Sequence, residues 1–421
     1  MIVAVLGARR LILSHFPRFR VPESLTPQRT RRHHRLSRTQ MGRLDFTAVI
    51  WLVAGLTPSA ALCAPALATT AQVAPAQPSV EERLKRVAAD LFVRMDRIGD
   101  AIRELQAILA IDPRSAQAHM LLGNAYVGEG APERKGEAIA EFRQALEIDP
   151  SLVAARFYMA DVYLDLGRTD MARDELQLAL SQAPGQPQFT ALLGEAERRL
   201  GHAPRSVELI RQALQADPSL TEARYHLSLA LLDLGQHADA IREMEQLVQS
   251  GVDIPDVQLT LGTAYVDAGR LDAAVTTLTR AASLAPARPD IRIQLARGYR
   301  LKGLLREADA QLALLPAPGS ALMIQNPVAY QRLSVARGLE LGELRMAQGR
   351  LLEATTAFTK ALEADPEQGR THERLAEVYL RRGEYRLALD HAVRAAVLGV
   401  PLAADRRLLL DQKIAAPGGS K

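Results

Sequence analysis

A repeat of about 34 residues runs along the chain from residue 82 to residue 402, and it constrains the fold more than any other feature. Asp-Pro or Ala-Pro dipeptides recur, and several of the gaps between them are 34 residues or twice 34. Alignment on these dipeptides gives nine units, which start near residues 82, 116, 153, 187, 221, 255, 289, 335 and 369. Self-similarity at such a period is typical of repeat architectures in which each unit packs only against its neighbours.

Each unit carries small residues at two fixed places. The eighth position is Ala, Gly or Ser in all nine units, and about twelve residues later a second small residue follows, such as Ala138 or Ala354. Two helices joined by a tight turn approach closely only where a small residue lies at their crossing, and a large apolar residue one turn away fills the space beside it. Because proline cannot continue a helix, the dipeptides end the second helix of each unit.

This pattern resembles the tetratricopeptide repeat family, whose signature L-G-x2-Y … A-x3-F … P is partly reproduced here. Leu122-Gly123-x2-Tyr126 and Leu261-Gly262-x2-Tyr265 match its first half, and Ala138-x3-Phe142 matches its second half. The family's opening Trp is absent, and the resemblance covers roughly three quarters of the chain. It implies an all-α fold, a right-handed α-solenoid of about nine helix hairpins with a C-terminal capping helix.

Two irregularities interrupt the array. Three extra residues lengthen the turn of the second unit, within 128–138. About a dozen further residues separate the seventh unit from the eighth, where prolines break the helical pattern. The sequence therefore predicts units one to seven over 82–322, an inserted linker or hinge over 323–334, units eight and nine over 335–402, and a capping helix with a tail over 403–421.

The N-terminal part has a different character. Residues 41–68 combine Arg43, a short apolar run and a final Ala66-Leu67-Ala68, which is the layout of a secretory signal peptide. Cleavage near Ala68 would leave a Pro/Ala-rich linker over 69–81; an uncleaved anchor is the alternative. Residues 1–40 form a basic stretch that is either an unstructured extension or the result of a misassigned start, with Met41 as the true first residue. Lipidation of Cys63 is disfavoured because Leu62 precedes it.

Charge and motifs exclude most other classes of function. Residues 1–43 hold ten Arg and one Glu, whereas from Thr69 onward 42 Lys plus Arg face 46 Asp plus Glu, so the repeat region is mildly acidic and gives no reason to expect nucleic-acid binding. His372-Glu373 begins like a zinc-binding H-E-x-x-H motif but lacks the second histidine. We expect no enzyme activity, no cofactor and no metal, and no stable membrane span.

The resemblance also indicates where a partner would bind. In the family the first helices line a concave groove, and the fifth and ninth positions of each unit point into it. The clamp that grips a C-terminal carboxylate in chaperone-binding members is absent, because Asn124 is paired with Met120. Apolar residues predominate instead, with one basic spot near the seventh unit. The expected groove residues are Met120, Asn124, Phe157, Asp161, Tyr225, Leu229, Leu259, Ile293, Arg297 and Arg300.

These observations favour a non-enzymatic scaffold or assembly factor that binds protein segments in the groove, in the periplasm as part of a bacterial cell-envelope complex. A cytoplasmic adaptor is the alternative if residues 41–68 do not direct export. A periplasmic glycan- or small-ligand-binding protein is a third hypothesis, and it would require aromatic stacking platforms such as Phe157 and Tyr225. The apolar fifth positions could also serve only to pack neighbouring helices. The oligomeric state is left open.

Overall fold

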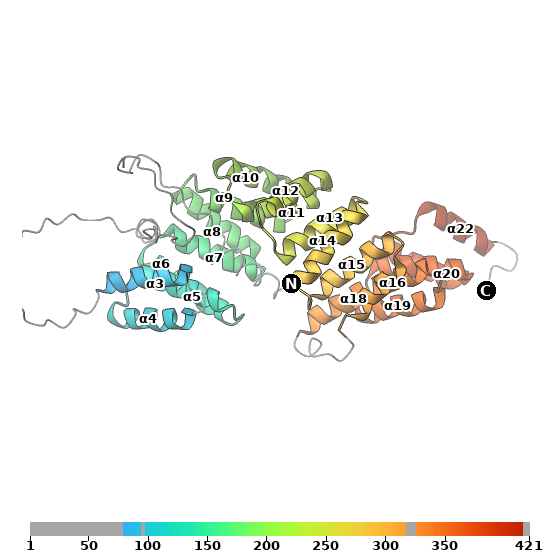
Figure 1. The fold of residues 1–421 in the computed structure, drawn as a ribbon, viewed down its shortest axis with the longest axis horizontal. Helices are drawn as coiled ribbons and strands as arrows, with labels where there is room; N and C mark the ends of the chain where they lie inside the picture. Colours follow the sequence, from blue (N-terminus) through green and yellow to red (C-terminus); the bar gives the residue numbers. More distant parts are fainter. Residues whose placement is uncertain (1–78, 94–96, 317–325, 416–421) are drawn as a thin grey trace, which may run out of the picture. The chain divides into compact units, whose positions relative to one another are not determined.

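The computed structural model describes residues 79–93, 97–316 and 326–415, and over these ranges the chain consists of nineteen α-helices and no strands (Figure 1). The first eleven helices after the N-terminal region are α3 (Val80–Val93), α4 (Ile98–Ile111), α5 (Ala116–Glu129), α6 (Arg134–Ile148), α7 (Val153–Asp165), α8 (Thr169–Gln182), α9 (Pro187–Arg199), α10 (Ala203–Ala216), α11 (Thr221–Asp233), α12 (His237–Gln249) and α13 (Pro255–Asp267). They are followed by α14 (Leu271–Leu284), α15 (Pro289–Leu301), α16 (Leu305–Ala313), α18 (Pro327–Ala347), α19 (Leu351–Ala364), α20 (Gly369–Arg382), α21 (Tyr385–Val397) and α22 (Ala404–Ala415). The predicted all-α architecture of helix hairpins with a final helix is confirmed.

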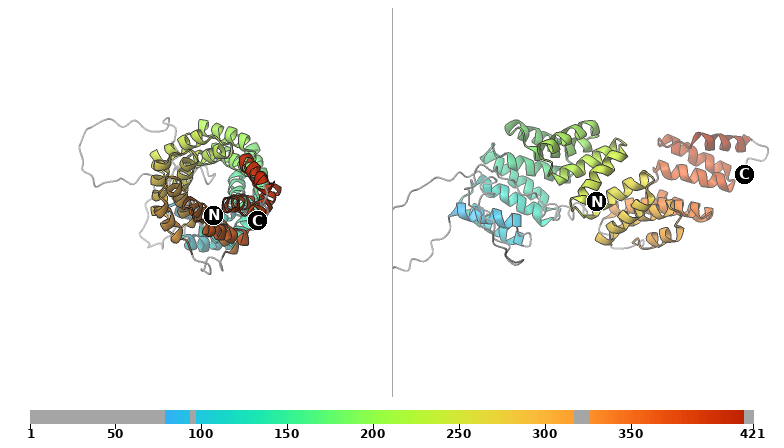
Figure 2. Two further views of the ribbon diagram at one scale, coloured as in Figure 1. Left: turned by 90° about the vertical axis from the view of Figure 1, so that its right-hand side faces the viewer. Right: turned by 45° about the horizontal axis from the view of Figure 1, so that its top comes forward.

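The described helices fall into two compact units. We call α3–α11 the N-terminal unit and α12–α22 the C-terminal unit, because the boundary lies between Leu234 and Gly235. Within each unit consecutive helices pack as pairs (Figure 2). We refer to the helix that opens each hairpin as its first helix; these are α3, α5, α7, α9, α11, α13, α15, α18 and α20.

Close approach between the two helices of a hairpin explains the small eighth position. A Cβ atom added to Gly123 of α5 would lie 2.7 Å from Cε1 of Phe142 on α6, and one added to Gly342 of α18 would overlap Phe358 of α19 in the same way. Both phenylalanines are fully buried. The large side chain of the second helix therefore occupies the volume that the glycine leaves empty.

Glycine also ends the first helix of most hairpins. Gly167, Gly201, Gly235, Gly269 and Gly303 follow one another at 34-residue intervals, and each has a positive φ. Only a residue without a Cβ atom adopts this left-handed conformation at no steric cost, so the tight turn to the second helix depends on it.

The eighth hairpin begins earlier than the sequence predicts. Helix α18 begins at Pro327, so residues 327–334 are helical rather than part of a linker. Asn326 caps this helix by accepting a hydrogen bond from the backbone N–H of Ala329, 3.0 Å away. Pro327 occupies the first helical turn, where its missing N–H does no harm.

Packing also continues across this point. Leu344 of α18 shares a buried cluster with Ile293 of α15 and Leu312 of α16. The break into seven plus two hairpins that the sequence predicts here is therefore not seen. The predicted signal peptide and the segments 1–40 and 69–78 lie outside the described residues.

Candidate protein-interaction surface

The predicted groove residues lie on first helices but differ in accessibility. Met120 is 2% exposed and Ile293 is 8% exposed, so both are core residues. The remaining ones are half-buried: Asn124, Phe157, Asp161, Tyr225, Leu229, Leu259, Arg297 and Arg300. Part of the apolar character at the fifth position thus serves packing, and part remains accessible.

An aromatic cluster bridges two consecutive first helices of the N-terminal unit. The rings of Phe157 on α7 and Phe189 on α9 stack with centroids 4.9 Å apart and planes 21° apart. Tyr158 meets the edge of Phe157 at 5.5 Å, and burial raises the pKa of its phenol. Phe157, Tyr158 and Phe189 are partly buried and rest on the core of this unit. Phe189 is not among the expected groove residues because it lies at the third position of its repeat, whereas the family's groove register uses the fifth and ninth positions.

A buried carboxylate organises the neighbouring part of the same surface. Glu195 of α9 is 1% exposed, and its two oxygens lie 2.8 and 3.0 Å from nitrogens of Arg198 and 2.5 Å from Nε of Arg199. Nδ1 of His226 on α11 lies 3.1 Å from Glu195 Oε2. Arg198 also contacts Asp233 of α11 at 2.9 Å, so charged contacts join α9 to α11.

The charges in this cluster stabilise one another. Burial opposes ionisation of Glu195, but His226 and Arg198 outweigh it, so the pKa of Glu195 is lowered. Burial likewise lowers the pKa of His226, but the charges and hydrogen bonds of Glu195 and Glu222 raise it to about 9. At neutral pH Glu195 and His226 are therefore oppositely charged, and their contact joins α9 to α11.

The predicted basic spot in the C-terminal unit does not present free cations. Arg297 donates to Asp267 at 2.8 Å. Arg300 donates from Nε to Glu340 at 2.6 Å and lies 3.9 Å from Glu343. Both guanidinium groups are thus neutralised by carboxylates within the protein.

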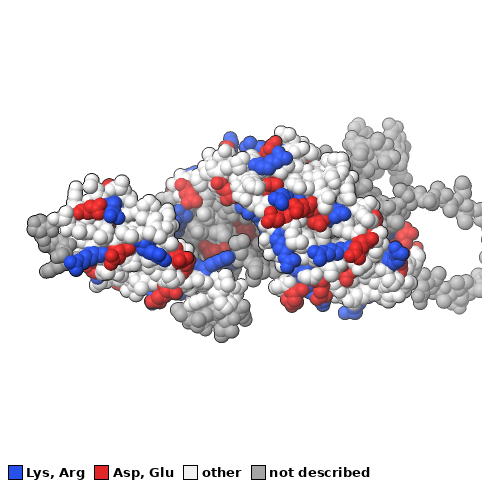
Figure 3. All heavy atoms as spheres, turned by 180° about the vertical axis from the view of Figure 1, so that it is seen from behind, with Lys and Arg blue, Asp and Glu red and all other residues white. Residues whose placement is uncertain are grey.

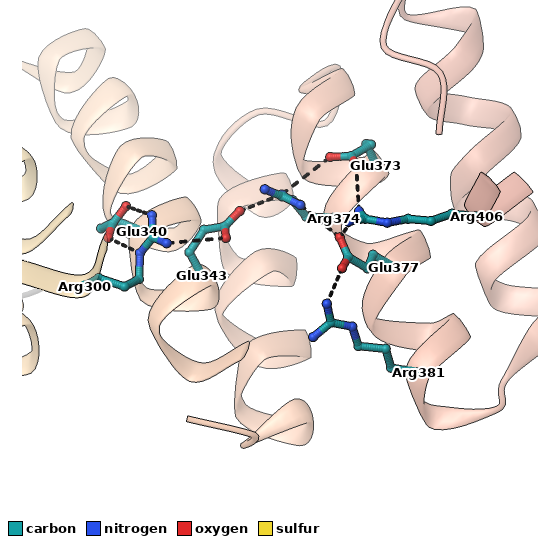
Figure 4. A network of polar contacts seen from close by, with 8 residues as sticks. All are labelled: Arg300, Glu340, Glu343, Glu373, Arg374, Glu377, Arg381 and Arg406. Carbon is teal, nitrogen blue, oxygen red and sulfur yellow. Dashed lines mark hydrogen bonds and ion pairs between the residues drawn. The ribbon is translucent and has the colours of Figure 1, made fainter. Parts of the chain in front are cut away.

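The contacts of Arg300 belong to a longer ion-pair network over α15, α18, α20 and α22 (Figure 4). Glu343 of α18 contacts Nε of Arg374 on α20 at 2.6 Å. Arg374 contacts Glu377 at 2.9 Å, and Glu377, only 3% exposed, also pairs with Arg381 and with Arg406 of α22.

Four carboxylates and four guanidinium groups alternate in this network, so it carries no net charge when all are ionised. Burial raises the pKa of Glu340 and of Glu373, although the neighbouring arginines oppose the shift. The network therefore joins α15, α18, α20 and α22 through compensated charges rather than displaying one sign of charge.

The molecular surface is similarly mixed. On the face drawn in Figure 3, Lys and Arg side chains alternate with Asp and Glu side chains over each unit. Among the residues that the structure describes, no group of three or more His, Cys, Asp or Glu side chains could hold a metal ion. None of the described helices has the length and apolarity needed to cross a bilayer.

Comparison with known proteins agrees with this architecture. Sequence profiles of the tetratricopeptide repeat match residues 86–151, 136–196, 171–297 and 339–405, about two thirds of the chain. The chain belongs to the tetratricopeptide repeat family. No curated protein sequence matches it significantly.

Solved structures of helical repeat proteins are similar to the chain. A chain of the APC/C hetero-tetramer Cut9–Hcn1 is 16% identical, with a TM-score of 0.56; the match covers 79% of this chain and 62% of that one. PilW, described as a widely conserved type IV pilus biogenesis factor, is 20% identical (TM-score 0.44, 51% of this chain and 94% of PilW). PilF of Pseudomonas aeruginosa is 18% identical (TM-score 0.43, 51% and 95%). At such identities, the likeness to the Cut9–Hcn1 chain shows a shared fold, and this chain spans less than two thirds of that relative.

Proposed function

We propose that this tetratricopeptide repeat protein is a scaffold whose first helices in the N-terminal unit bind an apolar or amphipathic segment of a partner protein. The fold supports an interaction role, and the partner-binding surface within it is our proposal. We further propose that the protein is exported and serves as an assembly factor for a bacterial cell-envelope complex.

The stacked pair of Phe157 and Phe189 is the observation that carries the binding site. A ring pair that bridges α7 and α9 offers a rigid apolar patch, because each ring is held by the other and has little rotational freedom to lose on binding. Half-buried Tyr225 and Leu229 on α11 would extend the patch within the same unit. Polar Asn124 would limit it on α5.

Affinity purification with the full chain and matched variants tests this site. Phe157→Ala removes the central ring, whereas Leu178→Ala truncates an apolar side chain that is 48% exposed on α8, a second helix. A partner anchored on the aromatic patch should bind Phe157→Ala at least about 30-fold more weakly, as for a central aromatic residue of an interface. The same partner should bind Leu178→Ala as it binds the unaltered chain.

Equal binding to Phe157→Ala and the unaltered chain would contradict the site. Phe157→Leu, which keeps apolar bulk, and a circular dichroism spectrum of each variant separate lost contact from lost folding. If instead both Phe157→Ala and Leu178→Ala lose the partner, the first-helix surface is not the determinant and the proposal fails.

Export needs its own experiment, because the signal layout of residues 41–68 lies outside the described residues. A reporter enzyme that is active only outside the cytoplasm, fused after residue 80, should be active. An inactive reporter would overturn the envelope role and leave the cytoplasmic adaptor. That result would leave the proposed binding surface on α7 and α9 unaffected.

A further inference from the structure

A recurrent polar contact joins the two helices of several hairpins. In the second hairpin, His119 of α5 contacts the carbonyl oxygen of Pro113 through Nε2 at 3.2 Å and Glu141 of α6 through Nδ1 at 2.6 Å. In the seventh, Arg292 of α15 donates to Pro286 O at 3.3 Å and to Gln311 of α16 at 2.8 Å. We call this place, at the fourth position of the unit, the cross-hairpin slot. A donor on the first helix meets an acceptor on the second.

The ninth hairpin departs from this rule. His372 of α20 contacts Pro366 O through Nε2 at 3.1 Å, as in the other slots, but Nδ1 faces Nδ1 of His391 on α21 at 2.8 Å. The ring of Tyr379 stacks on His391 with centroids 5.5 Å apart. His391 therefore places a second imidazole at the position where Glu141 and Gln311 place an oxygen atom in the other two hairpins.

Hydrogen-bond chemistry limits how many protons this pair can hold. A carbonyl oxygen only accepts, so Nε2 of His372 carries hydrogen. When both rings are neutral, Nδ1 of His372 accepts and Nδ1–H of His391 donates. One added proton can go to Nε2 of His391, which leaves the Nδ1–H···Nδ1 hydrogen bond between the two rings in place. A second leaves two N–H groups directed at each other, with no acceptor between two positive rings.

Few charged groups offset this repulsion. Burial lowers the pKa of His391 and His372 lowers it further, while Asp390 on the same helix opposes the shift. The guanidinium group of Arg382 on α20 lies over the ring of Tyr379 rather than over a histidine. Glu367, which precedes α20, pairs with Arg394 of α21. Among the residues that the structure describes, no charged side chain of α19 or α22 shifts the pKa of His391.

We propose that the His372–His391 pair makes the ninth hairpin acid-sensitive, so that α20 and α21 separate more readily when both histidines are protonated. The native hairpin holds fewer protons than the open chain below the ordinary histidine pKa of about 6.5. Stability is thus present above that pH and is lost as pH falls. Opening would uncover Ala376 of α20 and Ala388 and Ala392 of α21, which share one buried cluster. The inference is independent of the proposed function.

Amide hydrogen exchange of the full chain between pH 5 and 8, corrected for the intrinsic exchange rate, measures the opening constant of each hairpin. For α20 and α21 we expect the constant to rise as pH falls below 6.5, by up to about tenfold per pH unit for one proton taken up on opening. The α5–α6 hairpin, in which Glu141 faces His119, serves as an internal control in the same sample and should not loosen over this range.

Two variants assign the effect to the pair. H391Q supplies a group that can donate or accept, so the opening constant of α20 and α21 should lose its pH dependence. H391E copies the His119–Glu141 arrangement and should make this hairpin tighten as pH falls. A flat profile in the unaltered chain, or an unchanged rise in H391Q, would overturn the proposal; the comparison with α5–α6 decides the matter if a variant does not fold.

Discussion

Two buried glycines on first helices of the C-terminal unit, Gly298 on α15 and Gly338 on α18, differ in the space around them. A Cβ atom at Gly298 would lie 3.5 Å from Val275 Cγ2, with its next neighbours at 3.8 Å, which are ordinary contacts. A Cβ atom at Gly338 would lie 2.8 Å from the Cβ atom of Ala361 and 2.9 Å from the carbonyl oxygen of Ala357, both on α19. Alanine should therefore have opposite effects at the two positions.

The magnitudes follow from two opposing terms. Within a helix, alanine is more favourable than glycine by about 1 kcal/mol, and Gly298→Ala should gain this amount because its methyl group fits. Gly338→Ala has the same gain, but a backbone carbonyl cannot rotate away as a side chain does. Helices α18 and α19 must separate instead, at the upper end of the roughly 1–3 kcal/mol that overpacking costs. The net result is a loss of about 1–2 kcal/mol, so the variants should differ by about 2–3 kcal/mol.

Repeat arrays do not unfold as one cooperative step, so the comparison calls for local opening constants from hydrogen exchange rather than a single melting curve. For each variant, the opening constant of the altered hairpin is divided by its value in the unaltered chain. This ratio should be roughly 30- to 150-fold larger for α18 and α19 in Gly338→Ala than for α15 and α16 in Gly298→Ala. Stabilisation of α18 and α19 by Gly338→Ala would refute the reasoning, because it would mean that α18 and α19 have room for the methyl group.

Three further predictions concern other links in the structure. Phe358→Ala should destabilise the α18–α19 hairpin by about 3–5 kcal/mol, since the ring is fully buried and fills the space beside Gly342. Hydrogen exchange of α18 and α19 measures this loss, and a loss below about 1 kcal/mol would contradict the packing. Because the pKa of His226 is raised to about 9 from 6.5, its contribution to the N-terminal unit should be complete below pH 6.5 and should disappear as pH rises through 9. Hydrogen exchange of α9 and α11 across that range should show this decline as more frequent local opening at high pH, and His226→Asn should not show it. Asn326→Ala should cost about 1 kcal/mol by removing the cap of α18, whereas Asn326→Asp should keep most of the stability; exchange rates at the start of α18 report the difference, and equal rates in the two variants would argue against the cap.

Much of the fold could be predicted from the sequence because its determinants are local. A proline that ends a helix, a small residue at a crossing and a large residue one turn away all act within one unit, so the period exposes them. The left-handed glycines from Gly167 to Gly303 carry the same period and would have fixed the turns as well. The error at 327–334 arose from interpreting Pro327 only as a helix breaker, although an asparagine followed by proline is typical of a helix start.

The side-chain contacts that distinguish one repeat from another were less predictable from the sequence. Arg300 and Glu340 are forty residues apart and meet only because α18 packs against α15 beyond an irregular insertion. His372 and His391 lie nineteen residues apart, the spacing of Arg156 with Glu175 and of Arg292 with Gln311, so the regular register of the hairpins contained this signal. The two histidines lie on different helices, so no motif within a single helix contains both.

The first helices of the C-terminal unit carry paired charges and those of the N-terminal unit carry apolar rings, and this difference affects where a partner would gain most binding free energy. In the C-terminal unit, Arg300 is already paired with Glu340, and Glu377 with Arg406. A partner's charged group would therefore have to replace an internal ion pair and would gain little net energy. In the N-terminal unit, Phe157 and Phe189 are apolar and half-buried, and covering them removes apolar area from water without breaking any polar contact. The proposed binding site therefore belongs on α7 and α9, and binding there should depend little on salt concentration, whereas a partner held by exchanged ion pairs would bind more weakly as salt is raised.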